Sequence, residues 1–219
     1  MQQLTLKHLR AIRWFHWINF PLLAIMIWSG MLIYWAYAPY QIGSFHFFPA
    51  WFYAAFHIDH RLADGMALHF VFMWLFLLNG LLYVAYTIVS GEWRMLVPRS
   101  PVALKHSLQV VLYDLGVTRT LPPQEKYNAA QQLSYTMIVL MGAGSIITGL
   151  AIYKPVQVGF LTSLCGGYED ARAIHFALTI GYVLFFVVHI AQVVRAGWNN
   201  FRSMVTGYEI VPVTKEPAP

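Results

Sequence analysis

Long stretches without any Asp, Glu, Lys or Arg alternate with shorter charged stretches along the chain. The charge-free windows cover residues 14–58, 65–91, 127–153 and 173–194. Each window can hold a membrane-spanning helix, which needs about 20 mainly apolar residues. The pattern therefore predicts four spans, at residues 14–38, 66–89, 131–153 and 173–194.

The segments between the predicted spans differ in character. Residues 39–64 are broken by proline and glycine and are rich in aromatic side chains, which is typical of a segment at the outer membrane interface. Residues 92–130 contain apolar positions at near-helical spacing, which predicts an amphipathic helix on the inner membrane surface. We expect residues 195–219 to form a cytoplasmic tail. We find no internal repeat and expect a single domain over residues 1–219.

Basic residues are distributed unevenly between the two sides of these spans. If the N-terminus is inside, the inner segments carry eleven Lys and Arg residues, and the outer segments carry three, Arg61, Lys154 and Arg172. Basic residues flanking membrane helices favour the cytoplasmic side, so both termini are expected in the cytoplasm. The net charge of +5 then reflects topology and does not indicate nucleic-acid binding.

Composition supports the same class of protein. Apolar residues make up 58% of the chain and charged residues 11%, against about 25% charged in an ordinary soluble domain. This balance excludes a soluble domain and a disordered chain. The single cysteine, Cys165, excludes an internal disulfide and any four-cysteine metal site. The expected fold is an all-α four-helix transmembrane bundle.

Four of the nine histidines fall inside the predicted spans: His16, His69, His175 and His189. An imidazole in hydrocarbon is costly without a partner, so each is a candidate functional residue. His175 and His189 lie fourteen residues apart on one helix, which places them on nearly the same face and about 21 Å apart. Because successive spans run in opposite directions, His16 matches His189 near the inner surface, and His69 matches His175 near the outer surface.

Two bis-histidine sites stacked across a bilayer indicate two b-type haems, each with two axial imidazoles. The same histidines could instead form a proton relay in a haem-free, proton-coupled transporter, and a single one could simply be a hydrogen-bonded packing residue. Zinc is disfavoured because neither depth offers an evident third or fourth ligand.

Other residues near the histidines have two interpretations. Arg13 and Arg172 lie three residues before His16 and His175, where they could pair with haem propionates or simply be interfacial charges. Gly30 lies fourteen residues after His16, where it could leave space for a porphyrin or serve helix packing.

Short motifs accompany the four histidines along nearly the whole chain. They include Arg13-Trp14-Phe15-His16-Trp17-Ile18-Asn19, Ser29-Gly30, His69-Phe70, Leu78-Asn79-Gly80-Leu81, Lys126-Tyr127-Asn128, Thr148-Gly149-Leu150, Ile174-His175-Phe176 and Asn200-Phe201-Arg202. With these motifs the chain resembles the bacterial di-haem cytochrome b subunits of the cytochrome b561 group. That group includes the membrane anchors of formate dehydrogenases, nickel–iron hydrogenases and thiosulfate reductases.

The resemblance implies an electron-transfer subunit in the bacterial inner membrane. It would carry electrons between the quinone pool and an extracytoplasmic oxidoreductase, with a sulfite-oxidase-like molybdopterin protein as the expected partner, reached directly or through an iron–sulfur or haem protein. Some similar proteins act alone as superoxide:quinone oxidoreductases. They tend to be shorter than this chain, and its extra segments 39–64 and 92–130 favour a partnered subunit.

The resemblance also implies a quinone site near the inner haem. Asn128 and Gln131 match an Asn-x-x-Gln pattern of the group, whose members often have Pro-Gly where this chain has Ala129-Ala130, and Lys where it has Gln132. The two amides can hydrogen-bond a quinone carbonyl. Alternatively, Asn128 is the N-cap of the third span.

Overall fold

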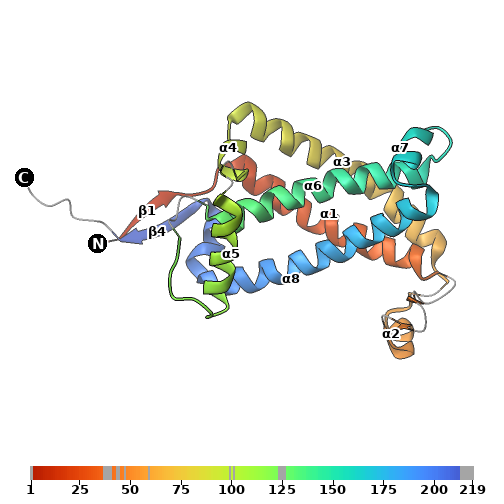
Figure 1. Cartoon of the computed structure of the whole chain (residues 1–219), viewed down its shortest axis with the longest axis horizontal. Coiled ribbons are helices and arrows are strands. Elements are labelled where there is room, and N and C mark those ends of the chain that lie inside the picture. The colour runs from red at the N-terminus through yellow and green to blue at the C-terminus, as the bar shows by residue number, and fades with distance from the viewer. Residues whose placement is uncertain are drawn as a thin grey trace, which may run out of the picture. The chain divides into compact units, whose positions relative to one another are not determined.

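The structure is a computed structural model that describes residues 2–36, 41–42, 45–46, 48–58, 60–98, 100, 102–122 and 127–212. The end of the first predicted span (37–38) and of the tail (213–219) lie outside the described residues, as do parts of segments 39–64 and 92–130. Among the described residues, four helices are long and apolar enough to cross a membrane: α1 (Arg10–Tyr34), α3 (Leu62–Ser90), α6 (Ala129–Tyr153) and α8 (Tyr168–Thr206) (Figure 1). They confirm the predicted helical membrane fold.

The ends of the helices differ from the predicted bounds. Helix α1 begins at Arg10, before the charge-free window, and α8 continues to Thr206, well past residue 194. Long basic side chains can reach the interface while their backbone remains helical, so charged residues do not end these helices. Within α8 the helical backbone is interrupted at Gly197, with φ 80° and ψ 175°, a conformation that favours glycine.

The described chain divides into two compact units, Met1–Leu81 with Gln192–Pro219, and Leu82–Ala191. In the first unit, α1 and α3 pack antiparallel. A Cβ added to Gly65 of α3 would lie 2.9 Å from Leu32 Cβ of α1, and toward the other end of the pair Asn79 Nδ2 donates to Asn19 Oδ1 at 3.5 Å. Gly65 therefore allows the two helices to approach closely.

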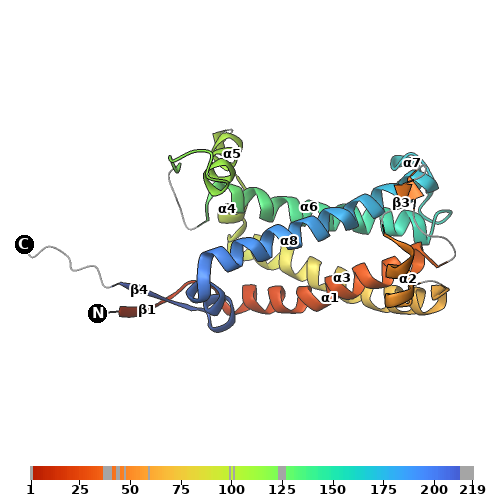
Figure 2. The ribbon, with the colours of Figure 1, turned by 90° about the horizontal axis from the view of Figure 1, so that it is seen from below.

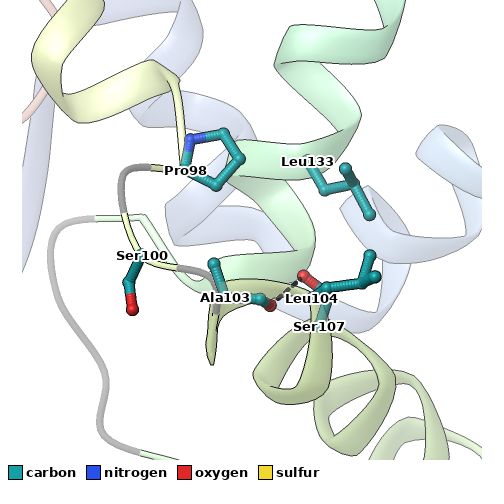
Figure 3. A pocket seen from close by; sticks show the side chains of 6 residues that line it. All are labelled: Pro98, Ser100, Ala103, Leu104, Ser107 and Leu133. Carbon is teal, nitrogen blue, oxygen red and sulfur yellow. Dashed lines mark hydrogen bonds between the residues drawn. The ribbon is translucent and has the colours of Figure 1, made fainter.

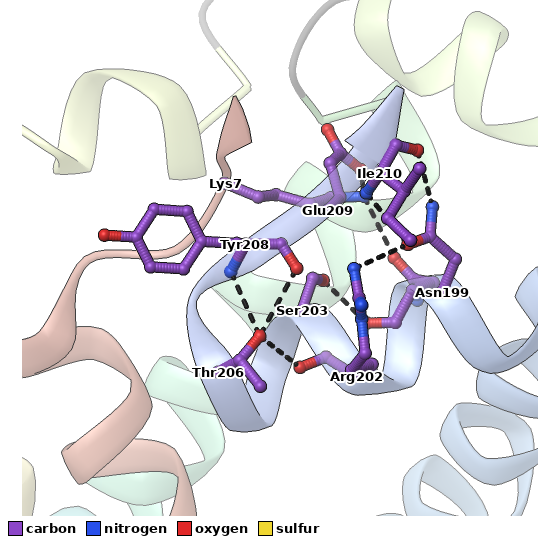
Figure 4. Close-up of polar contacts among 9 residues, drawn as sticks. Lys7, Asn199, Arg202, Ser203, Thr206, Tyr208, Glu209 and Ile210 are labelled. Atoms are coloured by element: carbon purple, nitrogen blue, oxygen red, sulfur yellow. Dashed lines mark hydrogen bonds and ion pairs between the residues drawn. The ribbon is translucent and has the colours of Figure 1, made fainter. Parts of the chain in front are cut away.

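The first unit also joins the N- and C-terminal segments. Strand β1 (Gln2–Leu6) pairs antiparallel with β4 (Tyr208–Pro212), as Figure 1 shows. Lys7 Nζ forms an ion pair with Glu209 Oε2 at 2.7 Å, and the Asn199 side chain bonds both the N–H and the C=O of Ile210 (Figure 4). The two segments are thus held side by side.

The segment after α1 contains short elements. Strands β2 (Gln41–Ile42) and β3 (Phe45–His46) form a small hairpin, and helix α2 (Ala50–Phe56) follows. Tyr53 of α2 is buried with its ring edge-to-face to Trp35, centroids 6.0 Å apart. Tyr53 therefore packs against the end of the first span.

In the second unit, α6 and α8 pack antiparallel through small residues. A Cβ on Gly144 would lie 3.1 Å from Leu178 Cδ1, and one on Gly181 would lie 2.8 Å from Met141 Cε. Helices α4 (Trp93–Leu96), α5 (Val102–Asp114) and α7 (Gly159–Leu164) also pack against α6. Figure 2 shows α4 and α5 near one end of α6 and α7 near the other.

Helix α5 contains the predicted amphipathic pattern, and its apolar stripe faces away from the protein. Its small side chains at Ala103 and Ser107 are buried with Val110. The larger side chains are exposed, namely Val102, Leu104, Leu108 and Val111. An outward apolar stripe beside a membrane helix is the arrangement expected of a helix in contact with lipid.

Candidate functional site

His69 is held on α3 by a hydroxyl group from α1. Ser29 Oγ lies 2.9 Å from His69 Nδ1 and 3.1 Å from the carbonyl oxygen of Met26 one turn earlier. A serine hydroxyl has one hydrogen, and Ser29 donates it to the Met26 carbonyl. In the Nδ1–H tautomer of His69, the Ser29 oxygen accepts a hydrogen bond from that nitrogen. The neutral ring then has its lone pair on Nε2, the nitrogen that can bind a metal.

His175 has the same arrangement on α8. Thr148 Oγ1 of α6 lies 2.8 Å from His175 Nδ1 and donates its hydrogen to the carbonyl of Gly144 at 2.7 Å. In the Nδ1–H tautomer of His175, the Thr148 oxygen accepts from that nitrogen and the lone pair is again on Nε2. The backbone of Ser145 also hydrogen-bonds this imidazole. Thr148 is 3% exposed and Ser29 is 0% exposed, so water does not compete for either hydroxyl group.

A glycine follows the hydroxyl residue in both helices. A Cβ on the glycine of Ser29-Gly30 would lie 3.7 Å from His69 Cε1, and one on the glycine of Thr148-Gly149 would lie 3.5 Å from His175 Cε1. The imidazole edge thus rests against a helix backbone in each unit. Sequence reasoning assigned no role to either hydroxyl; the only signal in the sequence was the recurrence of a Ser-Gly and a Thr-Gly pair in two of the spans.

The other two histidines contact aromatic rings. His16 on α1 lies edge-to-face with Trp17, with ring centroids 5.2 Å apart. His189 on α8 stacks nearly parallel to Phe185, with centroids 5.8 Å apart and an interplanar angle of 8°. Both rings therefore lie among aromatic side chains.

His69 and His175 occupy the same position along their helices when counted from the first helical residue. His69 comes seven residues after Leu62, the first residue of α3, and His175 comes seven residues after Tyr168, the first residue of α8. Seven residues correspond to about 10 Å along a helix axis. The pairs inferred from depth join histidines of different units, and that pairing stays a prediction.

The donor chemistry of these residues fits a b-type haem. Haem iron takes neutral imidazole nitrogens as axial ligands, and the hydrogen bonds to Nδ1 of His69 and His175 leave Nε2 for that role. In the part of the chain that the structure describes, no group of three or more His, Cys, Asp or Glu residues could hold a bare metal ion.

The two candidate propionate ligands have protein partners. Arg13 Nη1 donates to the carbonyl of Val205 at 2.6 Å, near the end of α8. Arg172 Nη1 pairs with Glu169 Oε2 at 2.9 Å on the exposed start of α8. A guanidinium group has five N–H donors, so neither contact uses its full capacity.

Asn128 and Gln131 form a capping box at the start of α6. Asn128 Oδ1 accepts from the Gln131 N–H at 2.9 Å, and Gln131 Oε1 accepts from the Asn128 N–H at 3.0 Å. The N-cap interpretation of Asn128 is therefore correct. Capping uses the amide oxygens, whereas a quinone carbonyl would need the amide N–H₂ groups, so the two roles are compatible.

Aromatic and acidic side chains lie close to this capping box. The rings of Tyr127 and Tyr135 are edge-to-face with centroids 5.3 Å apart. Burial raises the pKa of Tyr127 above its ordinary value, and the nearby Tyr135, Glu92 and Tyr83 raise it further. The Tyr127 phenol, next to Asn128 in the chain, thus stays protonated and can donate a hydrogen bond. Sequence reasoning did not identify this residue as a candidate.

A pocket of about 270 Å³ opens between α5 and α6 (Figure 3). It is lined by Pro98, Ser100, Ala103, Leu104, Ser107 and Leu133. Leu133 and Gln131 are two residues apart on α6, which places them about 200° apart around the helix. The Gln131 amide therefore belongs to a different side of α6 from this pocket.

Four apolar helices, three of which contain histidines, define a multi-pass membrane protein suited to binding haem. Residues 7–207 match the family model described as prokaryotic cytochrome b561, and the chain belongs to this family, which is one of b-type haem proteins of the membrane. The resemblance inferred from the sequence is thereby confirmed. A relative from Azospira oryzae is 32% identical over 179 residues, which cover 81% of this chain and 85% of the relative. It carries the provisional name protein-methionine-sulfoxide reductase subunit YedZ1.

Proposed function

We propose that the protein is a di-haem electron-transfer subunit that connects the quinone pool with an extracytoplasmic oxidoreductase across the bacterial inner membrane. The observation that carries the proposal is the set of four histidines within membrane helices, in a chain of the cytochrome b561 family. The whole chain, residues 1–219, would act as one cytochrome b domain with both termini in the cytoplasm.

His16 and His189 would bind the inner haem, and His69 and His175 the outer haem. When bound, each haem supplies one-electron redox chemistry. The protein supplies the axial imidazoles, an apolar environment that excludes water, and a fixed separation along the helices. Arg13 and Arg172 would neutralise haem propionates at the two membrane surfaces.

The relative's name supports a reductase as the partner. That protein is described as a subunit of a protein-methionine-sulfoxide reductase. By analogy, the partner of this chain would be an extracytoplasmic reductase of oxidised methionine, and we propose that this reductase is the molybdopterin protein that the family resemblance implies. Electrons would then flow outward, from quinol to the reductase. A membrane potential of 100 mV, negative inside, favours that direction by about 2.3 kcal/mol per electron.

The quinone site would lie at the inner end of α6. The capping box uses only the amide oxygens of Asn128 and Gln131, so their N–H₂ groups remain as donors. The protonated phenol of Tyr127 is a further donor next to Asn128 in the chain. Donors of this kind can hydrogen-bond the carbonyl oxygens of a quinone.

The proposal is tested by haem analysis of the purified protein and a ligand variant. The reduced-minus-oxidised spectrum should contain low-spin b-haem bands that correspond to two haems per chain. His69→Ala should retain one haem, while the control His106→Ala, which removes an imidazole from α5 outside the spans, should retain both. A wild-type protein without b-haem bands, or a His69→Ala protein with both haems, would show that the proposal is wrong.

A further inference from the structure

Two hydroxyl groups contact, in the same way, the two histidine imidazoles that are proposed to bind the outer haem. Ser29 Oγ lies 2.9 Å from His69 Nδ1 in the first unit, and Thr148 Oγ1 lies 2.8 Å from His175 Nδ1 in the second. Each hydroxyl comes from the helix that packs antiparallel to the helix of its histidine. The arrangement arises twice from different residues, so a chance contact does not explain it.

We propose that Ser29 and Thr148 are positioning residues that fix the orientation and protonation state of the two outer-haem ligands and thereby set that haem's reduction potential. The inference rests on the proposed function, which assigns His69 and His175 to one haem. It adds the two residues that act on the iron through those ligands.

The direction of the effect follows from hydrogen-bond chemistry. Each hydroxyl donates to a backbone carbonyl, at 3.1 Å for Ser29 and 2.7 Å for Thr148, and this polarises its oxygen as an acceptor. An acceptor on Nδ1–H makes the imidazole more basic at Nε2, and a more basic ligand stabilises ferric over ferrous iron. Without the hydroxyl, the reduced state should be favoured and the potential should rise.

The glycines beside the hydroxyls complete the constraint. His69 Cε1 and His175 Cε1 lie close to the backbones of Gly30 and Gly149, where an added Cβ would be 3.7 and 3.5 Å away. Each ring is therefore bounded on its Nδ1–Cε1 edge by a hydrogen bond and a backbone surface. Loss of the hydroxyl removes one of the groups that hold the ring, and electron paramagnetic resonance of oxidised low-spin haem detects the resulting change in ring orientation.

The test compares Ser29→Ala and Thr148→Val with the hydroxyl-retaining Thr148→Ser in the full-length, haem-loaded protein. A redox titration followed by absorption should show the reduction equilibrium of one haem shifted about tenfold, which is about 59 mV for a one-electron couple. Both variants should shift the same haem upward and leave the other unchanged, and Thr148→Ser should match the wild type. Loss of that haem alone would also support the proposal, since an unheld imidazole binds iron less well.

Three results would overturn the inference. The first is unchanged potentials and unchanged resonance signals in both hydroxyl-removing variants. The second is an equal effect on both haems, which indicates a general packing defect. The third is a Thr148→Ser protein that behaves like Thr148→Val. In each case, loss of one haem in His69→Ala would leave the proposed function standing, whereas retention of both haems there would refute the ligand assignment itself.

Discussion

Gly65→Ala tests the contact between α1 and α3 on which the position of His69 depends. An added Cβ would lie 2.9 Å from Leu32 Cβ, 3.0 Å from the Ile33 nitrogen and 3.0 Å from the Ser29 carbonyl oxygen. These atoms belong to the backbone of α1 or are fixed to it. The new methyl group can therefore be accommodated only if the two helices move apart.

The size of the effect follows from these distances. Carbon atoms in optimal contact are about 3.5–4.0 Å apart, so the helices must separate locally by about 0.5–1 Å. Overpacking of this kind costs about 1–3 kcal/mol. The better helix propensity of alanine returns about 1 kcal/mol. We expect a net loss near 1 kcal/mol, which lowers the melting temperature by about 2–4 °C for a chain of 150–250 residues.

The separation should also reach the candidate haem ligand. Ser29 moves with α1, so its 2.9 Å contact with His69 Nδ1 would lengthen beyond the usual limit of about 3.2 Å for such a hydrogen bond. Thermal denaturation in detergent and haem content per chain measure the two effects. Gly159→Ala on α7 is the matched control, because no atom lies within 4 Å of its added Cβ. If the two variants melt together and both retain two haems, the close approach at Gly65 is not essential to the packing.

Three further predictions concern the terminal segments, the porphyrin and the quinone. Gly207→Ala should lower the melting temperature more than Gly197→Ala. Gly207 and Gly197 both have a positive φ, 96° and 80°, so alanine is strained at either position. Only at Gly207 would the added Cβ also meet neighbours, 3.2 Å from the His8 carbonyl oxygen and 3.3 Å from the Arg13 guanidinium. Equal melting temperatures of the two variants would contradict this prediction. Gly30→Ala should lose one haem, because the added methyl group would occupy space proposed for the porphyrin. Its helical circular dichroism should be unchanged, because the protein without haem has room for the methyl group. Full haem content would favour the interpretation that Gly30 serves helix packing. Asn128→Asp keeps the capping oxygen but removes the N–H₂ group, so it should slow quinol-dependent haem reduction at an unchanged melting temperature, whereas an unchanged rate would leave Asn128 only a cap.

The membrane architecture could be predicted from the sequence because the charge deficit is a direct consequence of burial in lipid. The same rule misplaced helix ends, since Arg10 and Arg13 lie inside α1 rather than before it. The strand pair β1–β4 was missed because it joins segments about 200 residues apart, a pairing that local periodicity does not encode. The pattern in 102–115 indicated a helix, but only the packing shows that Ala103 and Ser107 are buried while Leu104 and Leu108 are exposed.

In the candidate site, the sequence predicts the histidines but not the residues that hold them. The four histidines stood out because an ionisable side chain is rare and costly in a membrane helix. Ser29 and Thr148 did not stand out, because hydroxyl residues are common in such helices and usually donate their hydrogen bond to a backbone carbonyl in the preceding turn. Their significance depends on a second contact, to a histidine 40 and 27 residues away along the chain, which exists only once the helices pack.

The packing also explains how ligand geometry can be set before a cofactor binds. The α1–α3 pair holds His69 through Ser29, and the α6–α8 pair holds His175 through Thr148, so each unit orients one imidazole with its own helices. A ring fixed in this way loses little further rotational freedom when it ligates iron, and this lowers the entropic cost of binding. On the proposed ligand assignment, the small residues that bring the helices together, Gly65 in one unit and Gly144 in the other, would also contribute to haem affinity.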